Sequence, residues 1–196
     1  MNMQLLPDID EKRGRILNAA LSVFALYGFK RASMEDIAKT AGMSRAAIYQ
    51  HFRNKEDILV HGVQAYFDVA ANSLSKALTP ARPLHEALQE ACASVSGGLA
   101  QALLDSPHGE ELLSMKAGEA EDATAAGNAR IASIWTDWLA QEEAAGRVRL
   151  PDGGAAEAAQ SIIAGQHGQK MLAQSYADYT ARLKVYADLM ARALTP

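Results

Sequence analysis

A short stretch around Gln50 carries residue types that read nucleic acid. In a helix, a rotation of 100° per residue would place Ile48 and Phe52 on one face, where both would be buried. The opposite face then holds small and polar side chains: Ala46, Tyr49, Gln50 and Arg53. Glutamine can read an adenine edge, arginine can read guanine or hold phosphate, and alanine lets the backbone come close. The stretch is therefore typical of a helix that enters a DNA groove.

Two cap signals position this face. Ser33 can cap a helix in which Asp36, three residues on, answers back to the cap. Gly42 should end that helix, because glycine tolerates the left-handed conformation of a helix end. Ser44 is a second cap residue, so the next helix should start near Arg45. Two short helices joined by a tight turn indicate a helix-turn-helix.

The same residues resemble the DNA-binding signature of the TetR (tetracycline-repressor) family of one-component transcriptional regulators. The resemblance covers about the first sixty residues. Its parts are the Phe24-x-x-Tyr27-Gly28-Phe29 ending of the preceding helix, residues 38–42, and Ser44-Arg45-x-x-Ile48-Tyr49-x-His51-Phe52-x-Asn54-Lys55-Glu56. It implies an all-α fold, with a helix-turn-helix DNA-binding domain at 1–55 and a helical effector-binding and dimerisation domain at 56–196.

The expected DNA contacts lie within this stretch: Ser33, Ser44, Arg45, Ala46, Ala47, Tyr49, Gln50, His51 and Lys55. Arg45 and Gln50 are expected to contact base edges. The resemblance implies phosphate contacts for Ser33, Tyr49, His51 and Lys55, although Tyr49 could pack between the helices instead.

The charge distribution agrees with a DNA-binding N-terminal part. The net charge is −4, but residues 12–55 hold nine Lys or Arg against two acidic residues, and residues from 61 onward hold ten against sixteen. Basic residues gathered at one end are an electrostatic footprint for nucleic acid. Cys92 is the only cysteine, which excludes an internal disulfide and favours a small buried hydrophobe. We expect a cytoplasmic protein, because there is neither a secretory signal order nor an apolar run of about 20 residues.

Hydrophobic periodicity predicts helices along the remaining chain. They are expected at 10–27, from 54 for about six turns, at 84–103 with a kink at Gly97-Gly98, from 106 to 115, around 131–139 and up to Gly146, at 155–175 and at 178–194. Linkers are expected at 79–83 and 147–154, and a loop near 117–121.

In the last two predicted helices, apolar and aromatic residues recur at spacings of three and four residues. Such a stripe is typical of a helix face that packs against another helix. The predicted dimer residues are Ile162, Gly165, Gly168, Tyr179, Leu183, Tyr186 and Met190. Packing within the same subunit is the alternative. The resemblance implies that these helices pair with their copies in a second subunit.

A predicted effector site completes the expectations. Its candidate residues are Tyr66, Phe67, Cys92, Val95, Leu99, Trp135, Trp138, His167 and Met171, which could equally be plain core. Glycines at 97, 98, 165 and 168 would remove side-chain volume where helices pack. The ligand should be mainly hydrophobic, oriented by hydrogen bonds from Tyr66, His167 or an indole.

No catalytic constellation stands out. The histidines at 51, 61, 85, 108 and 167 are scattered without metal-ligand spacing, and Gly153-Gly154 lacks the Lys-Ser/Thr of a phosphate loop. We expect that the protein is not an enzyme and binds no cofactor or metal. We expect instead a homodimeric repressor that a small-molecule effector releases from an inverted-repeat operator. A DNA-architectural protein and a helical enzyme with an embedded pocket are the alternatives.

Overall fold

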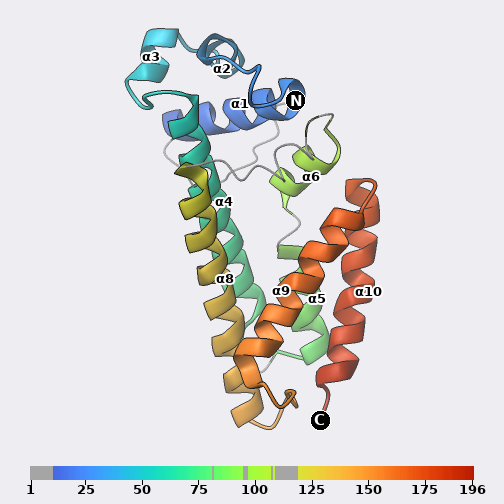
Figure 1. The fold of residues 1–196 in the computed structure, drawn as a ribbon. Helices are drawn as coiled ribbons and strands as arrows, with labels where there is room; N and C mark the ends of the chain where they lie inside the picture. Colours follow the sequence, from blue (N-terminus) through green and yellow to red (C-terminus); the bar gives the residue numbers. More distant parts are fainter. Residues whose placement is uncertain (1–10, 81, 95–96, 107, 109–118) are drawn as a thin grey trace. The chain divides into compact units, whose positions relative to one another are not determined.

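The computed structural model describes residues 11–80, 82–94, 97–106, 108 and 119–196. Throughout these ranges the regular secondary structure is helical, with no strand, which confirms the all-α prediction. The helices in Figure 1 are α1 (Glu11–Tyr27), α2 (Met34–Ala41), α3 (Arg45–Tyr49), α4 (Lys55–Ala77), α5 (Leu84–Ser94), α6 (Gly98–Leu104), α8 (Glu119–Ala144), α9 (Gly154–Leu172) and α10 (Tyr176–Leu194).

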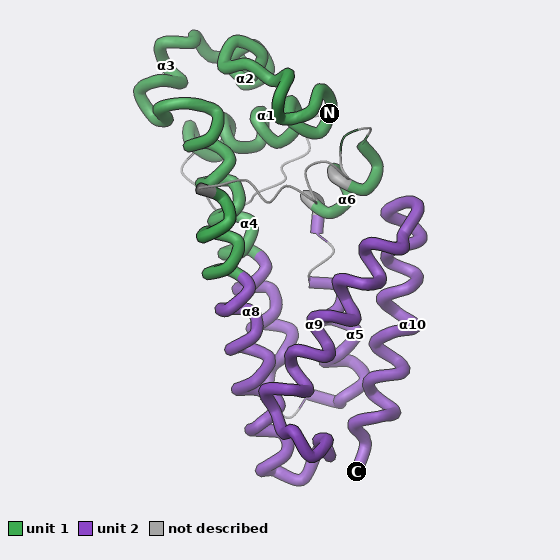
Figure 2. Tube along the Cα trace, viewed as in Figure 1, with its two compact units in different colours: residues 1–69, 98–127 green, residues 70–97, 128–196 purple. Residues whose placement is uncertain are grey.

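The chain divides into two compact units, drawn in different colours in Figure 2. Unit 1 comprises residues 1–69 and 98–127, and unit 2 comprises 70–97 and 128–196. The division falls within α4 and within α8, whereas the sequence interpretation places a domain boundary at residue 55. The first turns of α4 belong to unit 1 because Ile58, 1% exposed, is part of its core.

The core of unit 1 is built on one face of α1. Ile16, Ala20 and Phe24 are completely buried there. They pack in one cluster with Ile37 of α2 and Ile48 of α3. Burying a large aliphatic or aromatic side chain contributes about 1.5–3 kcal/mol, so α1 is the support on which the helix-turn-helix rests.

The core of unit 2 brings α5 and α10 together. Leu88 and Ala91 of α5 are buried, as are Leu183 and Ala187 of α10. Spacings of three and four residues put each pair on one helix face. The buried face of α10 therefore points to α5 of the same chain.

Several predicted boundaries shift. The predicted helix at 84–103 divides into α5 and α6, with Gly97 in a bend before α6. The predicted loop at 117–121 is helical from Glu119 onward. The short helix predicted for 106–115 lies almost entirely outside the described residues. Gly146 follows the end of α8 with a positive φ of 70°, as expected for a residue that ends a helix.

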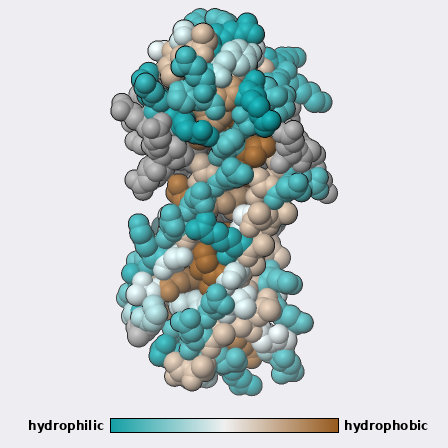
Figure 3. Space-filling view, turned by 90° about the vertical axis from the view of Figure 1, so that its left-hand side faces the viewer, coloured by the Kyte–Doolittle hydropathy of each residue, from teal (hydrophilic) through white to brown (hydrophobic). Residues whose placement is uncertain are grey.

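Within the described ranges, no helix is both long enough and apolar enough to cross a membrane. On the face shown in Figure 3, hydrophobic residues form small areas among hydrophilic ones. Scattered exposed apolar residues of this kind are normal on protein surfaces.

Candidate nucleic-acid interface

The N-terminus of α2 is fixed by a complete capping box. The Ser33 hydroxyl accepts a hydrogen bond from the Asp36 amide at 3.2 Å, and the Asp36 carboxylate accepts one from the Ser33 amide at 3.1 Å. The Ser33 hydroxyl also donates to that carboxylate, which is the main cause of a lowered pKa of Asp36. The predicted cap is confirmed, but the Ser33 side chain is already engaged within the protein, and its expected phosphate contact stays a prediction.

A side chain of α1 stabilises the C-terminus of α2. Gly42 is left-handed, with φ 64°, as predicted from its position. The guanidinium of Arg15 donates to the carbonyl oxygen of Ala41 at 2.8 Å. A cation at a helix C-terminus also interacts favourably with the helix dipole. Because Arg15 and Ala41 are 26 residues apart, the sequence pattern did not reveal this contact.

The second helix of the motif is short. Ser44 caps it, because its hydroxyl accepts from the Ala47 amide at 3.2 Å. Regular α-helix ends at Tyr49, so Gln50 and His51 lie in the following turn rather than inside a longer helix. Phe52 is nevertheless buried, 2% exposed, as predicted.

The expected reading face is exposed. Ser44, Arg45, Ala46, Tyr49 and Gln50 are exposed in unit 1, whereas Ala47 and His51 are half-buried. A face of this composition offers donors, acceptors and close backbone approach to a DNA groove. The structure thus brings seven of the nine predicted DNA-contact residues together on α3 and its flanks.

Arg45 and Tyr49 interact with each other on this face. The guanidinium donates to the Tyr49 hydroxyl at 3.3 Å, and its central carbon lies 5.5 Å from the ring centroid. Tyr49 is 45% exposed, so it does not pack between the helices in this structure. The hydrogen bond to Tyr49 is the main cause of a raised pKa of Arg45, which keeps its positive charge.

Lys55 is the predicted contact residue whose surroundings differ most from the expectation. Its ammonium donates to the carbonyl oxygens of Phe29, Lys30 and Ala32 at 2.9, 3.2 and 3.1 Å. An ammonium has three N–H donors. All three N–H donors bond to the loop before α2, so Lys55 connects the start of α4 to that loop. The ammonium therefore presents no free donor to a phosphate.

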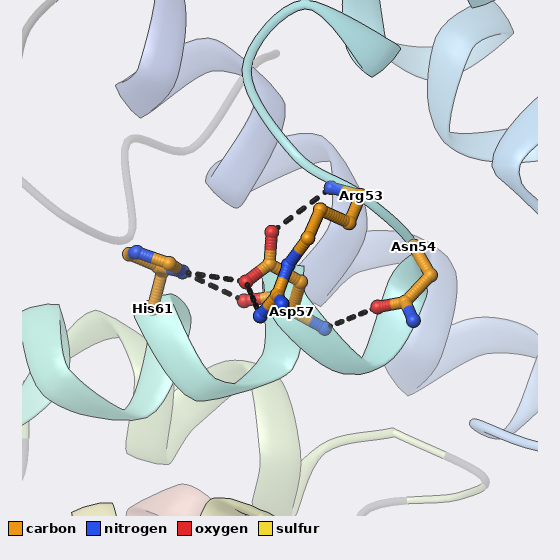
Figure 4. Close-up of polar contacts among 4 residues, drawn as sticks. All are labelled: Arg53, Asn54, Asp57 and His61. Carbon is orange, nitrogen blue, oxygen red and sulfur yellow. Dashed lines mark hydrogen bonds and ion pairs between the residues drawn. The ribbon is translucent and has the colours of Figure 1, made fainter.

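A further polar cluster at the start of α4 surrounds Asp57 (Figure 4). The Asn54 side chain accepts a hydrogen bond from the Asp57 amide at 2.8 Å. The Asp57 carboxylate accepts from the Arg53 amide at 2.9 Å and from its guanidinium at 3.2 Å, and lies 3.6 Å from the His61 ring. Burial opposes ionisation of Asp57, but the hydrogen bonds from Arg53 outweigh it and lower the pKa. The cluster fixes the turn between the exposed face of α3 and the start of α4.

The predicted effector residues do not form one group within either unit. Tyr66 and Phe67 belong to unit 1, where their rings are 5.1 Å apart at the centroids and a side chain at Gly127 would collide with Phe67. Cys92, Trp135 and Trp138 are buried in unit 2. In the same unit His167 and Met171 are exposed, which places these two side chains at the surface. Val95 lies outside the described residues, as does the side chain of Leu99.

A hollow of about 540 Å³ does occur in unit 2, at a different place. It lies between the segment after α8, the first half of α9 and the end of α10. Its lining includes Arg149, Asp152, Ser161, Ile162, Met190 and Thr195. None of the nine predicted effector residues lines it, although two predicted dimer residues do.

Three of the seven predicted dimer residues are buried inside the subunit. Ile162, Tyr179 and Leu183 are each 2% exposed within one chain. Their stripe has the predicted periodicity, but α5 of the same chain covers it on α10. These side chains therefore present little surface to a second subunit. Met190 and Gly168 are half-buried.

Gly165 does not open a cavity. A side chain at this position would collide with Tyr186, whose hydroxyl donates towards the carbonyl oxygens of Ser161 and Ile162, both at 3.2 Å. Burial, with nearby Cys92, raises the pKa of Tyr186 to about 12, so the hydroxyl remains a donor. The Tyr186 ring therefore occupies the space that a side chain at Gly165 would fill. The interpretation that Gly165 leaves room for a ligand cavity is wrong.

The described residues contain no group of three His, Cys, Asp or Glu side chains that could hold a metal ion. What the site does contain is a capped helix-turn-helix on a helical core, with an exposed polar face. These features define the class of helix-turn-helix proteins.

Comparison with known proteins shows which helix-turn-helix proteins this chain resembles. Residues 16–61 match the model of the family described as bacterial regulatory proteins, tetR family. The transcriptional activator FasR of Mycolicibacterium smegmatis is 38% identical over 69 residues, which cover 35% of this chain and 32% of FasR. The alignment thus spans about a third of that relative's length. The N-terminal part of this chain is thus similar to TetR-family regulators.

Solved structures extend the similarity of the fold to nearly the whole chain. FadR from Bacillus subtilis, solved with stearoyl-CoA, has a TM-score of 0.75 at 22% identity, covering 91% of this chain and 97% of FadR. The complex of triclosan with SmeT, the repressor of a Stenotrophomonas maltophilia efflux pump, has a TM-score of 0.72 at 21% identity, covering 95% and 93%. Both helical parts of the chain therefore have the TetR-type fold.

Proposed function

We propose that the protein is a transcriptional regulator that binds an inverted-repeat DNA operator as a homodimer, represses transcription, and is released by a small, mainly apolar effector. The observation that carries the proposal is the exposed face of α3. Arg45, Tyr49 and Gln50 are exposed there, while Ile48 of the same helix is completely buried. The core thereby holds the helix by one side and leaves the other for DNA.

Sequence reading is assigned to Gln50 and Arg45. A glutamine amide can make two hydrogen bonds to adenine, and arginine can make two to guanine. Contact with Tyr49 at 3.3 Å restricts the conformations of Arg45 before DNA is bound. Ala46 and Ala47 let the backbone approach the bases, while phosphate contacts by flanking residues fix the register.

The homodimer is assigned to a face different from the predicted stripe. Met171 and Leu172 of α9 are 52% and 65% exposed, and Val185 and Leu189 of α10 are 61% and 56% exposed. Large apolar side chains exposed on two adjoining helices favour a protein partner. A second copy is the partner proposed, because the TetR resemblance implies pairing of the last two helices and a two-fold axis would bring the same face of each chain together.

We propose that the protein lowers transcription from its promoter and is therefore a repressor. FasR is named an activator and SmeT a repressor, so relatives of both kinds exist. Transcription from the operator-bearing promoter, measured in vitro with and without the protein, decides the sign. A rise in transcript on adding the protein would contradict repression.

An effector would act by population shift. FadR and SmeT were solved with stearoyl-CoA and triclosan, both of which have large apolar parts. If such a molecule binds the DNA-incompetent state more tightly, each difference of about 1.4 kcal/mol changes the ratio of the two states tenfold. The continuous helix α4, which has residues in both units, is the element proposed to carry the change.

The central test is selection of preferred duplexes from random DNA, followed by titration of the selected and a scrambled duplex at fixed salt. Preference for the selected duplex by about a thousandfold or more is expected for a specific regulator. Equal affinity for both duplexes would indicate an architectural DNA-binding protein instead. No binding to either, with turnover of a substrate, would indicate the enzyme alternative.

A further inference from the structure

Trp135 and Trp138 form a buried pair on α8 within unit 2. They are 0% and 4% exposed, and their rings meet edge to face, with centroids 6.0 Å apart and planes at 76°. The chain has no other tryptophan. Ile131 and Leu139 are buried on the same face of α8, as is the carboxylate residue Glu142 one turn beyond Trp138.

The indole N–H groups of both tryptophans are buried donors. The Nε1 atoms of Trp135 and Trp138 are buried and have no hydrogen-bond partner among the described residues. An indole nitrogen is a donor and cannot turn round to accept. Leaving a buried donor unpaired costs about 1–3 kcal/mol, and native proteins rarely retain such groups without a water, an ion or a ligand to satisfy them.

The two rings cannot satisfy each other. In an edge-to-face pair, the edge of one ring points at the face of the other. An N–H group can donate weakly to an aromatic face, but this geometry allows that for one of the two indoles at most. At least one donor therefore needs an acceptor from outside the pair.

We propose that the two indole N–H groups are the polar end of a buried site for a small, mainly apolar, uncharged molecule with a hydrogen-bond acceptor, such as a ketone or an ester. A carbonyl oxygen accepts hydrogen bonds and carries no proton, so it suits a site whose polar groups are N–H donors. One or two neutral donors alone offset only part of the cost of burying an anion, so we expect the molecule to be uncharged. The inference rests on the proposed function, because this molecule would be the effector.

Entry to the site requires movement. Both indoles are covered by protein, and neither lines the hollow between α9 and α10. A molecule reaches them by separating the side chains that cover them, as at pockets opened by their ligands.

The test uses the full-length protein labelled with ¹⁵N. Two indole N–H resonances are expected, since there are two tryptophans, and Trp135→Phe and Trp138→Phe assign them. The probes are alkyl phenyl ketones with one to six alkyl carbons, each paired with the alkylbenzene of matching shape. At least one ketone should move an indole resonance downfield and bind about three- to tenfold more tightly than its alkylbenzene.

Trp138→Phe and Trp135→Phe keep an aromatic ring and remove one donor each. At least one of them should weaken binding of the ketone about three- to tenfold and leave that of the alkylbenzene unchanged. The proposal is overturned if no ketone moves either resonance, as expected when a water alone satisfies the indoles. Equal binding of ketone and alkylbenzene overturns it as well. Affinity of the wild-type protein for the selected duplex, measured in parallel, separates the two hypotheses. If the protein does not bind that duplex, the proposed function is refuted. If it binds the duplex but no ketone has an effect, only the indole site is refuted.

Discussion

The ammonium of Lys55 lies 2.9 Å from the carbonyl oxygen of Phe29 and 4.8 Å from the centroid of the ring of the same residue. One charged group thus contacts both the backbone and the side chain of the loop that leads into α2. A lysine expected at a DNA phosphate is instead part of the framework that holds the helix-turn-helix.

Lys55→Ala should therefore lower the free energy of unfolding, by about 2 kcal/mol, because it removes charge-assisted hydrogen bonds to three carbonyl oxygens. Urea unfolding followed by circular dichroism measures the change. Lys30→Ala, at an exposed position in the same loop, should stay within about 0.5 kcal/mol of wild type. If Lys55→Ala leaves stability intact but reduces the salt slope of DNA binding by about one, the residue holds a phosphate in the complex.

Gln50→Ala should relax base preference. Loss of a two-bond contact to adenine should cost about 1–3 kcal/mol of discrimination at one position in each half-site, with little change for scrambled DNA. Competition titrations with duplexes changed one base pair at a time measure it. Gln64→Ala on α4, also exposed, is the matched control and should keep the wild-type preference. A uniform loss of affinity on all duplexes would remove Gln50 from sequence reading.

Asp57→Asn should change the response of stability to acid. The folded-state pKa of Asp57 lies below its usual value, so its contribution is present above the unfolded pKa of about 3.9 and is lost as pH falls below that value. We expect the variant to be about 2 kcal/mol less stable than wild type at pH 7, with the gap closing between pH 4 and pH 2. Urea titrations across this range test it, with Asp152→Asn, an exposed carboxylate, as control. A gap that persists at pH 2 would mean that the charge of Asp57 is not what stabilises the turn.

Leu189→Glu should split the proposed dimer without unfolding the chain. Leu189 is 56% exposed in one chain, whereas Leu183 is 2% exposed. Leu183→Glu would bury a carboxylate in the core and should unfold unit 2. Lys184→Glu introduces the same residue at an exposed position of α10 and should leave the dimer unchanged. Sedimentation velocity distinguishes these outcomes, and a dimer that persists with Leu189→Glu would place the subunit contact elsewhere.

Gly165→Ala and Gly168→Ala should change stability in opposite directions. A side chain at Gly165 collides with Tyr186, so an overpacking cost of about 1–3 kcal/mol is expected. Beyond the backbone of its own helix and its chain neighbours, no atom lies within 4 Å of a Cβ placed at Gly168, and alanine is favoured over glycine in a helix by about 1 kcal/mol. Thermal unfolding of both variants in the Leu189→Glu background, where a partner subunit does not contribute, tests the contrast. Equal shifts would mean that the close approach of Tyr186 to α9 is not rigid.

Local signals predicted the helix-turn-helix well because they act within three or four residues. Ser33 and Gly42 determine where α2 begins and ends, and Ser44 determines where α3 begins, by hydrogen bonds and backbone conformation close by. Hydrophobic spacing likewise identified the face of α10 that contains Leu183. It could not identify the covering helix, since α5 lies about a hundred residues earlier and offers an apolar face as suitable as that of another subunit. The carbonyl partners of Lys55 were hidden for the same reason.

The fit of Tyr186 against Gly165 also has a consequence for how this protein can evolve. A residue larger than glycine at 165 becomes acceptable once the ring at 186 is replaced by a small side chain, and a tyrosine at 186 is acceptable only opposite a glycine. Each single exchange passes through a less stable intermediate, so the two positions should change together. Among descendants of one ancestor, pairs of small and large residues at 165 and 186 should therefore occur in complementary combinations far more often than chance allows.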